Sequence, residues 1–518
     1  MLDAPAGLLA GAIAIAGATM ESPFVDDAVT THRTRSPPEK PADAVTAAAA
    51  PAAAAVASFL SRRDLWLRLC EQLRSGGSRE LSPAGLACAL HYAKGLLVAA
   101  PTVEEVGSLF LGAESGEGEQ GGRGGLVGAI CANILERRHL QAVLDWPPRM
   151  GGGVAGLARI VTAAVGAVRV PLASDGPHKA VLLRMQQAMH SQGLVGALLA
   201  ATRVLHRGGD AAAGRGPESK EAQDAGGGVK GGGNRDREGG RWAREATAVA
   251  VVLAENDDDD DDDDDAQREV ALCACAELLS RLVLASPHFS LQFLEGGGLD
   301  GLVSAGALRE AAPAPLAVGA LVIFSQLARA SADNYDGLRA AGVDAGLGGL
   351  LGHADPAVRA KACNLVGNLC RHSAFFYPAL REGRRSGGGR PDEGGEKSIA
   401  DRLVDLCADP DPSARKFACF AVGNAAFHSD ALYARLAPAV APLVAALDDP
   451  EEKTRANAAG ALGNLVRNGG TLSAGLARRG GVGALLDLAA RDPAPSPRRI
   501  ALFSLGTCCA YVPCREAL

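Results

Sequence analysis

The sequence has few aromatic residues and no long uncharged hydrophobic run. Phe, Trp and Tyr make up only 4% of the 518 residues, whereas apolar residues as a whole reach 47%. The apolar content is therefore mostly Ala, Leu and Val, which favours helices packed on helices over a β-sandwich. No stretch of about twenty apolar residues is free of charge, which predicts that the chain does not span a membrane.

The sequence also lacks a strong excess of basic charge. Its formal net charge is −7, but the aspartates at 257–265 supply nine negative charges, and without them the net charge is +2. Binding to nucleic acid usually requires a basic domain or a basic face. We therefore expect protein partners, and neither nucleic acid nor a membrane.

The twelve cysteines do not form the pattern of a disulfide framework or of a metal site. Several lie among apolar residues at helical spacing, where a reduced thiol packs as a small hydrophobic side chain. None has His or Cys neighbours at the spacing that zinc requires. We predict structural thiols in a reducing, cytoplasmic compartment, with no metal and no cofactor. The apolar run 8–18 has the length of a signal-peptide core but lacks the basic residues that precede one.

Composition divides the chain into four parts. Residues 1–57 are rich in Ala, Pro and Thr, which predicts a disordered leader, and residues 58–207 show the apolar periodicity of a helical domain. Residues 208–265 are mostly Gly-rich and poly-Asp sequence, which predicts a linker because it buries too little apolar area to offset its ordering entropy. Residues 266–518 carry repeats, interrupted by a Gly-rich loop insert at 382–398.

The C-terminal region repeats a helical segment about every forty residues. Five copies align, at 315–329, 355–372, 411–428, 449–468 and 496–510. In the middle three copies an Arg precedes an Asn by nine residues, giving the pairs Arg359 and Asn368, Arg415 and Asn424, and Arg455 and Asn464. Gln326 and Thr507 occupy the Asn position in the outer copies.

Apolar residues in each copy fall on one face of a helix. In one copy they are Val358, Ala362, Leu365, Val366 and Leu369, and the other copies repeat these offsets. A shorter helix is predicted before each copy, and an Asp-Pro pair marks the break before the next helix. One such unit cannot bury its own apolar stripe, whereas stacked units can. The predicted fold class is therefore all-α, an α-solenoid.

A period of about forty residues with Gly-Asn-Leu in the last helix resembles armadillo repeats. Three segments resemble more closely the C-terminal armadillo region of Fused-type serine/threonine kinases, including their plant TWO-IN-ONE-type members. Their sequences are VRAKACNLVGNLCRH, PSARKFACFAVGNAAFH and KTRANAAGALGNLVRN. The likeness covers about 343–518. It implies an armadillo/HEAT-type solenoid, and members of that family carry a kinase domain at their N-terminus.

The motifs required for kinase catalysis are missing from this sequence. It contains no H-R-D catalytic loop and no D-F-G metal-binding motif, and the G-x-G-x-x-G match at 296–301 has no strand lysine after it. We therefore predict no catalytic residues and no enzyme activity in this chain. The alternative is that the chain is the regulatory C-terminal part of a serine/threonine kinase whose catalytic domain lies outside it.

The resemblance to armadillo repeats implies a concave groove in which the Asn of each last helix binds an extended peptide or a helix. The candidate partner-binding residues are Asn368, Arg371, His372, Asn424, Phe427, His428, Asn464, Arg467 and Asn468. An equally open alternative is that each Asn only ties its own repeat to the next. The Arg at the start of each helix is expected to pair with an Asp across the repeat joint.

Together these features predict a non-catalytic scaffold for protein–protein interaction. The resemblance to Fused-type proteins implies partners in cytoskeletal assembly, such as kinesin-like motors at the phragmoplast, or ciliary and signalling components, and a cytoplasmic, cytoskeleton-associated location. A nuclear transport receptor is disfavoured, because those receptors place Trp four residues before the Asn. This sequence has Asn364, Phe420 and Gly460 there.

Overall fold

The computed structural model describes residues 82–99, 102, 106–107, 110–111, 125–172, 179–213, 261–382 and 397–518. The predicted leader, most of the linker and most of the loop insert lie outside these residues. The described residues form helices and, among them, no strand, which confirms the all-α prediction. The chain divides into two compact units, Met1–Leu278 and Leu279–Leu518.

The N-terminal unit is built around the long apolar helix α8. Its described helices are α4 (Pro83–Ala99), α6 (Leu126–Ala129), the π-helical turn η4 (Ile130–Ile134), α7 (Arg137–Leu144), the 3-10 turn η5 (Pro148–Met150), α8 (Gly153–Leu172), α9 (Lys179–Ser191) and α10 (Leu194–Ala213). Helix α8 packs against α4, α7 and α10. The helical domain predicted for 58–207 therefore has helical structure in its described part, and α10 continues past residue 207.

One described segment, Pro148–Leu172, is long and apolar enough to cross a membrane by length and composition. The sequence predicted no such segment, because no stretch of about twenty apolar residues is free of charge. In the structure 56% of the apolar window is buried inside the protein, since α8 is the central packing element of its unit. Buried core helices meet the same length and composition criterion as spanning helices.

Helix α12 (Asp261–Ala285) begins inside the poly-Asp run. The last five aspartates of the predicted linker are therefore helical, and the predicted boundary at 265/266 falls within a helix. Carboxylates are stabilised near a helix N-terminus, where the macrodipole is positive. An ion pair of 2.9 Å between Asp265 and Arg268, one turn further along, also stabilises this part of the helix.

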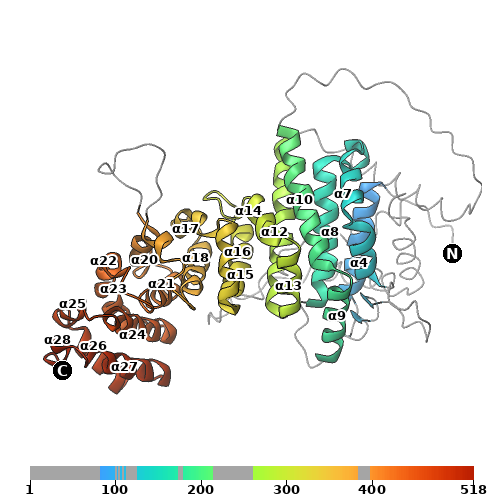
Figure 1. Cartoon of the computed structure of the whole chain (residues 1–518). Helices are drawn as coiled ribbons and strands as arrows, with labels where there is room; N and C mark the ends of the chain where they lie inside the picture. The colour runs from blue at the N-terminus through green and yellow to red at the C-terminus, as the bar shows by residue number, and fades with distance from the viewer. Residues whose placement is uncertain are drawn as a thin grey trace, which may run out of the picture. The chain divides into compact units, whose positions relative to one another are not determined.

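The C-terminal unit consists of five three-helix repeats that follow one another from α13 to α27 (Figure 1). In repeat order the helices are α13 (Pro287–Glu295), α14 (Gly298–Ser304) and α15 (Ala314–Ala330); α16 (Tyr335–Ala340), α17 (Val343–Leu351) and α18 (Pro356–Leu369); α19 (Tyr377–Arg381), α20 (Ile399–Leu406) and α21 (Pro412–Ala425); α22 (Tyr433–Leu436), α23 (Val440–Ala445) and α24 (Glu452–Arg467); and α25 (Ser473–Arg478), α26 (Gly481–Arg491) and α27 (Pro495–Cys508). Short 3-10 turns (η7, Ala332–Asn334; η8, Ala437–Ala439; η9, Ala446–Asp448) and α28 (Val512–Arg515) complete the unit.

The third helices of consecutive repeats stack directly on one another. Helix α15 packs on α18, α18 on α21, α21 on α24 and α24 on α27. The predicted apolar face is the buried one: Val358, Ala362, Leu365, Val366 and Leu369 are all fully buried. These contacts confirm the α-solenoid, in which each repeat covers the apolar stripe of its neighbour.

Glycine at one position lets the third helices approach closely. A Cβ atom built on Gly367 would lie 2.4 Å from the ring of Phe420 in the next repeat, and one on Gly463 would lie 2.5 Å from Oγ of Ser504. Gly423 holds the same position, where a Cβ would lie 3.4 Å from Cα of Ala461. The Gly of the Gly-Asn pair is thus a packing residue of the joint.

The G-x-G-x-x-G match is a corner between two helices. Gly296 ends α13 and Gly297, with φ of 64°, precedes α14, so a helix and not a strand comes before the motif. A Cβ on Gly298 would lie 2.4 Å from the Phe293 ring. The glycines therefore serve a tight turn and close packing.

Most of the described thiols are buried, as the sequence predicted. Burial raises the pKa of Cys370 to about 12 and the pKa of Cys275 to about 12, whereas Cys509 is exposed. Because the thiolate is the reacting species, we expect iodoacetamide to alkylate Cys509 in the native protein and to leave Cys363, Cys370 and Cys419 unlabelled until urea unfolds the repeats. Peptide mass spectrometry would measure the labelling, and fast native labelling of Cys363 would contradict the described packing.

Candidate functional site

A row of arginine–aspartate pairs crosses three repeat joints. Arg359 pairs with Asp409 at 2.8 Å, Arg415 with Asp449 at 2.9 Å, and Arg455 with Asp492 at 2.6 Å. We call these three pairs the Arg–Asp ladder. Each Arg sits in the first turns of a third helix, and each Asp precedes the third helix of the next repeat. The prediction that this Arg pairs with an Asp across the joint is confirmed.

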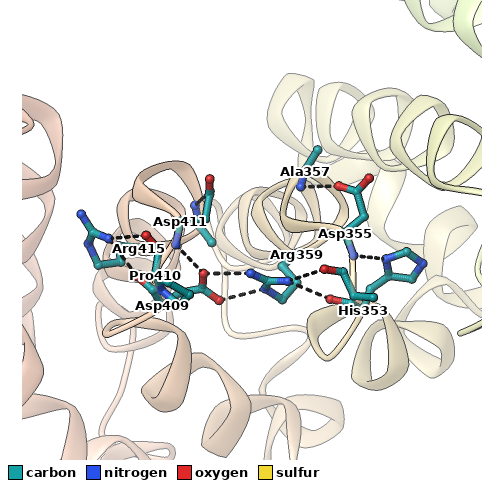
Figure 2. Close-up of polar contacts among 10 residues, drawn as sticks. His353, Asp355, Ala357, Arg359, Asp409, Pro410, Asp411 and Arg415 are labelled. Carbon is teal, nitrogen blue, oxygen red and sulfur yellow. Dashed lines mark hydrogen bonds and ion pairs between the residues drawn. The ribbon is translucent and has the colours of Figure 1, made fainter.

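Each ladder Arg also donates hydrogen bonds to the backbone carbonyls just before its own helix. Arg359 donates from Nη1 to the carbonyls of His353 and Ala354, both at 2.9 Å, and from Nε and Nη2 to the two oxygens of Asp409. Figure 2 shows Arg359 between His353 and Asp409. Arg415 and Arg455 repeat the backbone contacts at the same offsets. Five donors in a fixed fork suit this bidentate role, which Lys could not reproduce.

All three ladder aspartates are buried, and in two of them the balance of contacts favours the charged form. Hydrogen bonds from Arg455 lower the pKa of Asp492, against burial, which acts to raise it. For Asp409 burial is the largest influence and acts to raise the pKa, but the hydrogen bonds from Arg359 and from the Asp411 N–H together outweigh it. Both pKa values therefore lie below the usual range of an Asp.

The ladder aspartates were not identified as site residues from the sequence. Every Asp-Pro pair was interpreted as a helix break, but in the structure these aspartates form two groups with different partners. Asp355 and Asp411 cap α18 and α21 by accepting backbone N–H groups, whereas Asp409, Asp449 and Asp492 each lie six residues before an Arg and pair with the preceding Arg. The fixed six-residue offset was the available signal.

A tyrosine in the first helix of three repeats holds the end of the third helix. Tyr335 donates to the carbonyl of Asn368 at 2.8 Å and accepts from the N–H of His372 at 3.2 Å. Tyr377 bridges Asn424 and His428 in the same way, and Tyr433 bridges Asn464 and Asn468. We call these three residues the Tyr clamp.

The Tyr clamp satisfies backbone groups at the ends of α18, α21 and α24. The last carbonyls of a helix have no intrahelical partner, and the hydroxyl supplies a donor and an acceptor at that point. The candidate residues Arg371, His372, Phe427 and His428 lie beyond the third helices, because α18 ends at Leu369 and α21 at Ala425. These residues therefore lie in the turn after the helix. Four of the five tyrosines lie in the C-terminal unit, a clustering that sequence reasoning overlooked.

Replacing Tyr377 by Phe is expected to lower the free energy of unfolding by about 1–3 kcal/mol. The change removes the partner of both the Asn424 carbonyl and the His428 N–H while leaving the ring. Burial raises the pKa of Tyr377, so the hydroxyl remains a donor at neutral pH. Urea denaturation measures the loss. The matched variant is Tyr511→Phe, which removes one exposed hydrogen bond, and an equal loss in both variants would contradict the clamp.

The three predicted Asn side chains lie at the same place in successive third helices. Asn424 Nδ2 donates to the Gly367 carbonyl at 2.8 Å and Asn464 Nδ2 to the Gly423 carbonyl at 2.9 Å. Each amide thus ties its repeat to the preceding one. No described residue donates to Oδ1 of Asn424 or Asn464, and both side chains are only half-buried. The contact between repeats therefore uses Nδ2 and leaves Oδ1 of both amides without a donor from the described residues.

Asn368 differs from the other two. Its side chain is buried, and Nδ2 donates to Ser325 Oγ at 2.7 Å and to Asn364 Oδ1 at 3.3 Å. Its Oδ1 is buried without a hydrogen bond from the described residues. Ser325 holds the position of the joint glycine, so its hydroxyl accepts the bond that a carbonyl accepts in the next two joints.

The residue four positions after each Asn makes a second hydrogen bond to the preceding repeat. His372 Nε2 lies 3.1 Å from the Arg329 carbonyl and His428 Nε2 lies 3.3 Å from the Arg371 carbonyl. Asn468 donates to the carbonyls of Ala426 and Phe427. A carbonyl only accepts, so each imidazole carries its proton on Nε2 in this contact.

Several basic side chains of the third helices, and of the turns after them, form no ion pair with a described carboxylate. Arg371 is exposed and forms no ion pair within the described part of the chain, and the guanidinium of Arg467 lies 4.3 Å from the centre of the half-exposed Phe427 ring. Burial and the neighbouring Lys416 lower the pKa of Lys361. We call Asn424, Asn464, Arg371, Arg467 and Phe427 the Asn row.

Nothing in the described residues suggests metal chemistry. No group of three or more His, Cys, Asp or Glu side chains among them is placed to hold a metal ion. The predicted site residues that the structure brings together are instead amides, guanidinium groups and one aromatic ring. Such groups recognise peptide backbones and carboxylates.

The chain has recognisable relatives among known proteins. A family model described as a HEAT-like repeat matches residues 412–465. Serine/threonine-protein kinase 36 from Pongo abelii is 33% identical over 185 residues, which is 36% of this chain and 12% of the relative. Serine/threonine-protein kinase TIO from Arabidopsis thaliana is 37% identical over 248 residues, 45% of this chain and 18% of the relative. The chain thus spans less than a fifth of either kinase.

Solved structures of similar fold include a designed armadillo repeat protein in complex with the peptide (KR)4. It is 21% identical to this chain and covers 48% of it and 95% of its own length, with a TM-score of 0.39. The stacked third helices and the HEAT-like match identify the C-terminal unit as a helical repeat solenoid, and its sequence is similar to those of serine/threonine-protein kinases 36 and TIO, as the sequence resemblance predicted.

Proposed function

We propose that this chain is a non-catalytic scaffold that holds an extended acidic segment of a partner protein along the Asn row. The observation that supports the proposal is that only one end of the Asn424 and Asn464 amides is hydrogen-bonded within the described chain. Each amide donates to the preceding repeat and keeps Oδ1 without a donor from the described residues. A peptide N–H would satisfy that oxygen.

The spacing of the repeats suits a peptide in extended conformation. Packed helices lie about 8–10 Å apart, and an extended chain advances about 3.3 Å per residue. Successive Asn side chains would therefore meet backbone N–H groups two to three residues apart. Contacts to the backbone tolerate many peptide sequences, so they supply affinity and direction more than specificity.

Charge supplies the specificity in this proposal. Arg371, Lys361 and Arg467 have no ion pair with a described carboxylate, and the guanidinium of Arg467 lies over the Phe427 ring. A partner carrying Asp or Glu would complete these groups. Phe427, 38% exposed, would cover an apolar side chain between the acidic ones.

The double variant Asn424→Ala plus Asn464→Ala is expected to weaken partner binding at least about tenfold, because two backbone contacts are lost. Stability should fall by only about 0.5–1.5 kcal/mol per lost amide bond. The full chain would serve as bait in cell extract at fixed salt, and quantitative mass spectrometry would compare the proteins recovered by each variant.

Asn457→Ala is the matched control for this experiment. Asn457 also donates across the joint, to the Lys416 carbonyl at 3.0 Å, but lies about two turns from Asn464. The Asn457→Ala variant should lose one hydrogen bond between repeats and still bind the partner. Equal recovery by the double variant and the wild type would refute the proposal.

The cellular setting remains a proposal based on resemblance. The similarity to two serine/threonine kinases, of which the chain covers 12% and 18%, favours a regulatory, partner-holding role beside a kinase activity located elsewhere. We further propose a cytoplasmic, cytoskeleton-associated role in phragmoplast or cilium assembly. Fluorescence microscopy of the tagged chain tests this: enrichment on microtubule arrays is expected, and a uniform distribution would contradict it.

A further inference from the structure

A small cavity in the N-terminal unit is lined by residues of α4 and α7. Its volume is about 180 Å³, slightly more than that of an engineered apolar cavity of about 150 Å³ that binds benzene. The cavity therefore has room for one aromatic ring. The lining residues are Pro83, Leu86, Arg138, His139, Ala142, Val143 and Trp146.

A break in the helical backbone before α7 positions His139 in this lining. The π-helical turn η4 ends at Ile134, and Glu136 has extended backbone angles, so α7 begins as a new helix. The last carbonyls of a helix have no intrahelical partner, and Nδ1 of His139 lies 3.0 Å from the Ile134 carbonyl. The Glu136 carboxylate accepts the backbone N–H of His139 at 3.2 Å. Both the ring and the backbone of His139 are therefore held in place.

These contacts leave Nε2 of His139 without a partner. A carbonyl only accepts, so Nδ1 carries the proton of the neutral ring and Nε2 is a hydrogen-bond acceptor. His139 is only 9% exposed, and no described residue donates to Nε2. A buried acceptor without a donor costs free energy, so a ligand that brings a donor into the cavity would be favoured.

Arg138 supplies a positive charge to the same cavity. Its side chain is exposed and forms no ion pair with a described carboxylate. The other walls are mainly apolar, since Leu86 and Val143 are buried and Trp146 adds an indole ring. The cavity thus combines a buried acceptor, an apolar wall and a cation on its exposed side.

We propose that this cavity binds an aromatic carboxylic acid of one ring that also carries a hydroxyl or N–H donor. The donor meets Nε2 of His139, the ring packs on the apolar wall, and the carboxylate pairs with Arg138. The ligand is either a free acid or the C-terminal tyrosine of a polypeptide, because both present the same three groups. This site and the Asn row belong to different units of the chain, so each is tested separately.

The experiment is a ligand-observed NMR titration of the full chain with matched probes. 4-Hydroxyphenylacetate carries the ring, the donor and the carboxylate, whereas phenylacetate lacks the donor and 2-(4-hydroxyphenyl)ethanol lacks the carboxylate. We expect 4-hydroxyphenylacetate to bind with a Kd of about 1 mM or tighter. Each of the other two should bind at least about fivefold more weakly. The peptide Gly-Gly-Tyr separates the two sources: tighter binding than that of the free acid indicates a C-terminal tyrosine, and weaker binding indicates a free acid.

Two variants assign the binding to the cavity. His139→Asn keeps an N–H donor near the place of Nδ1 and has no atom in the place of Nε2. This variant should therefore bind 4-hydroxyphenylacetate and phenylacetate equally. Arg138→Gln should remove the advantage of the carboxylate. Arg137→Gln is the control, because Arg137 is also exposed but does not line the cavity, and it should bind every probe as the wild type does.

Three results would overturn the proposal. They are equal affinities of the wild type for the three small probes, no binding of 4-hydroxyphenylacetate, and a His139→Asn variant that still distinguishes 4-hydroxyphenylacetate from phenylacetate. The first two require only the wild type, so they decide the question even if a variant does not fold.

Discussion

Replacing Asp449 by Ala is expected to lower the free energy of unfolding by about 3–5 kcal/mol, the cost of leaving a buried charge without its partner. Asp449 is 5% exposed and Arg415 is 20% exposed in the pair that joins repeats three and four. Without the carboxylate, the guanidinium keeps only its backbone contacts to Asp409 and Pro410. Urea denaturation followed by circular dichroism measures the change.

The control is an ion pair of equal length on the surface. Arg491 and Asp487 lie 2.9 Å apart in α26 and are 78% and 64% exposed, so Asp487→Ala should change stability by no more than about 0.5 kcal/mol. A double variant, Asp449→Ala with Arg415→Met, should recover much of the loss because the unpaired charge is gone. Similar losses for Asp449→Ala and Asp487→Ala would show that the ladder does not hold the joints together.

Acidification is expected to unfold the C-terminal repeats over the pH range in which Asp409 and Asp492 protonate. The pKa values of Asp409 and Asp492 are lowered in the folded protein relative to about 3.9 in the unfolded chain. A group with a depressed folded pKa contributes stability that is fully present above the unfolded value. That contribution is lost as the pH falls from about 4 through the folded pKa.

Urea midpoints measured between pH 6 and pH 2 test this expectation. The wild type should lose stability steeply below about pH 4. Asp492→Asn should start less stable at pH 6 and approach the wild type as the pH falls, because the wild type then loses the same charge. A constant difference between the two proteins across the whole pH range would contradict the proposed linkage.

Much of the fold followed from the residue pattern alone. The offsets from Val358 to Leu369 specify one buried helical face, and their recurrence at a forty-residue period specifies stacking, since a stripe of that width needs a neighbour. The first helices of the repeats were not predicted. Segments such as Tyr377–Arg381 have only five residues, too few to show a periodicity, and tertiary contacts hold them in helical form.

The site was predicted in part. The Asn and Arg positions follow from spacing within a single helix, which a sequence displays directly. The partners of those residues across the repeat joints lie 31 to 57 positions away, as with Tyr433 and the Asn464 carbonyl or Asn424 and the Gly367 carbonyl. Which atom of an amide faces the joint depends on how neighbouring repeats dock, and this geometry is not encoded in local spacing.

Photo-crosslinking from the Asn row tests the central claim most directly. The full chain would carry p-benzoylphenylalanine in place of Phe427, on the row, or of Leu486, an exposed residue of the second helix α26. The account predicts that irradiation in cell extract captures a partner from position 427 and not from 486, and that Asn424→Ala plus Asn464→Ala removes the crosslink. Equal capture from both positions, or a crosslink that survives the double variant, would contradict it.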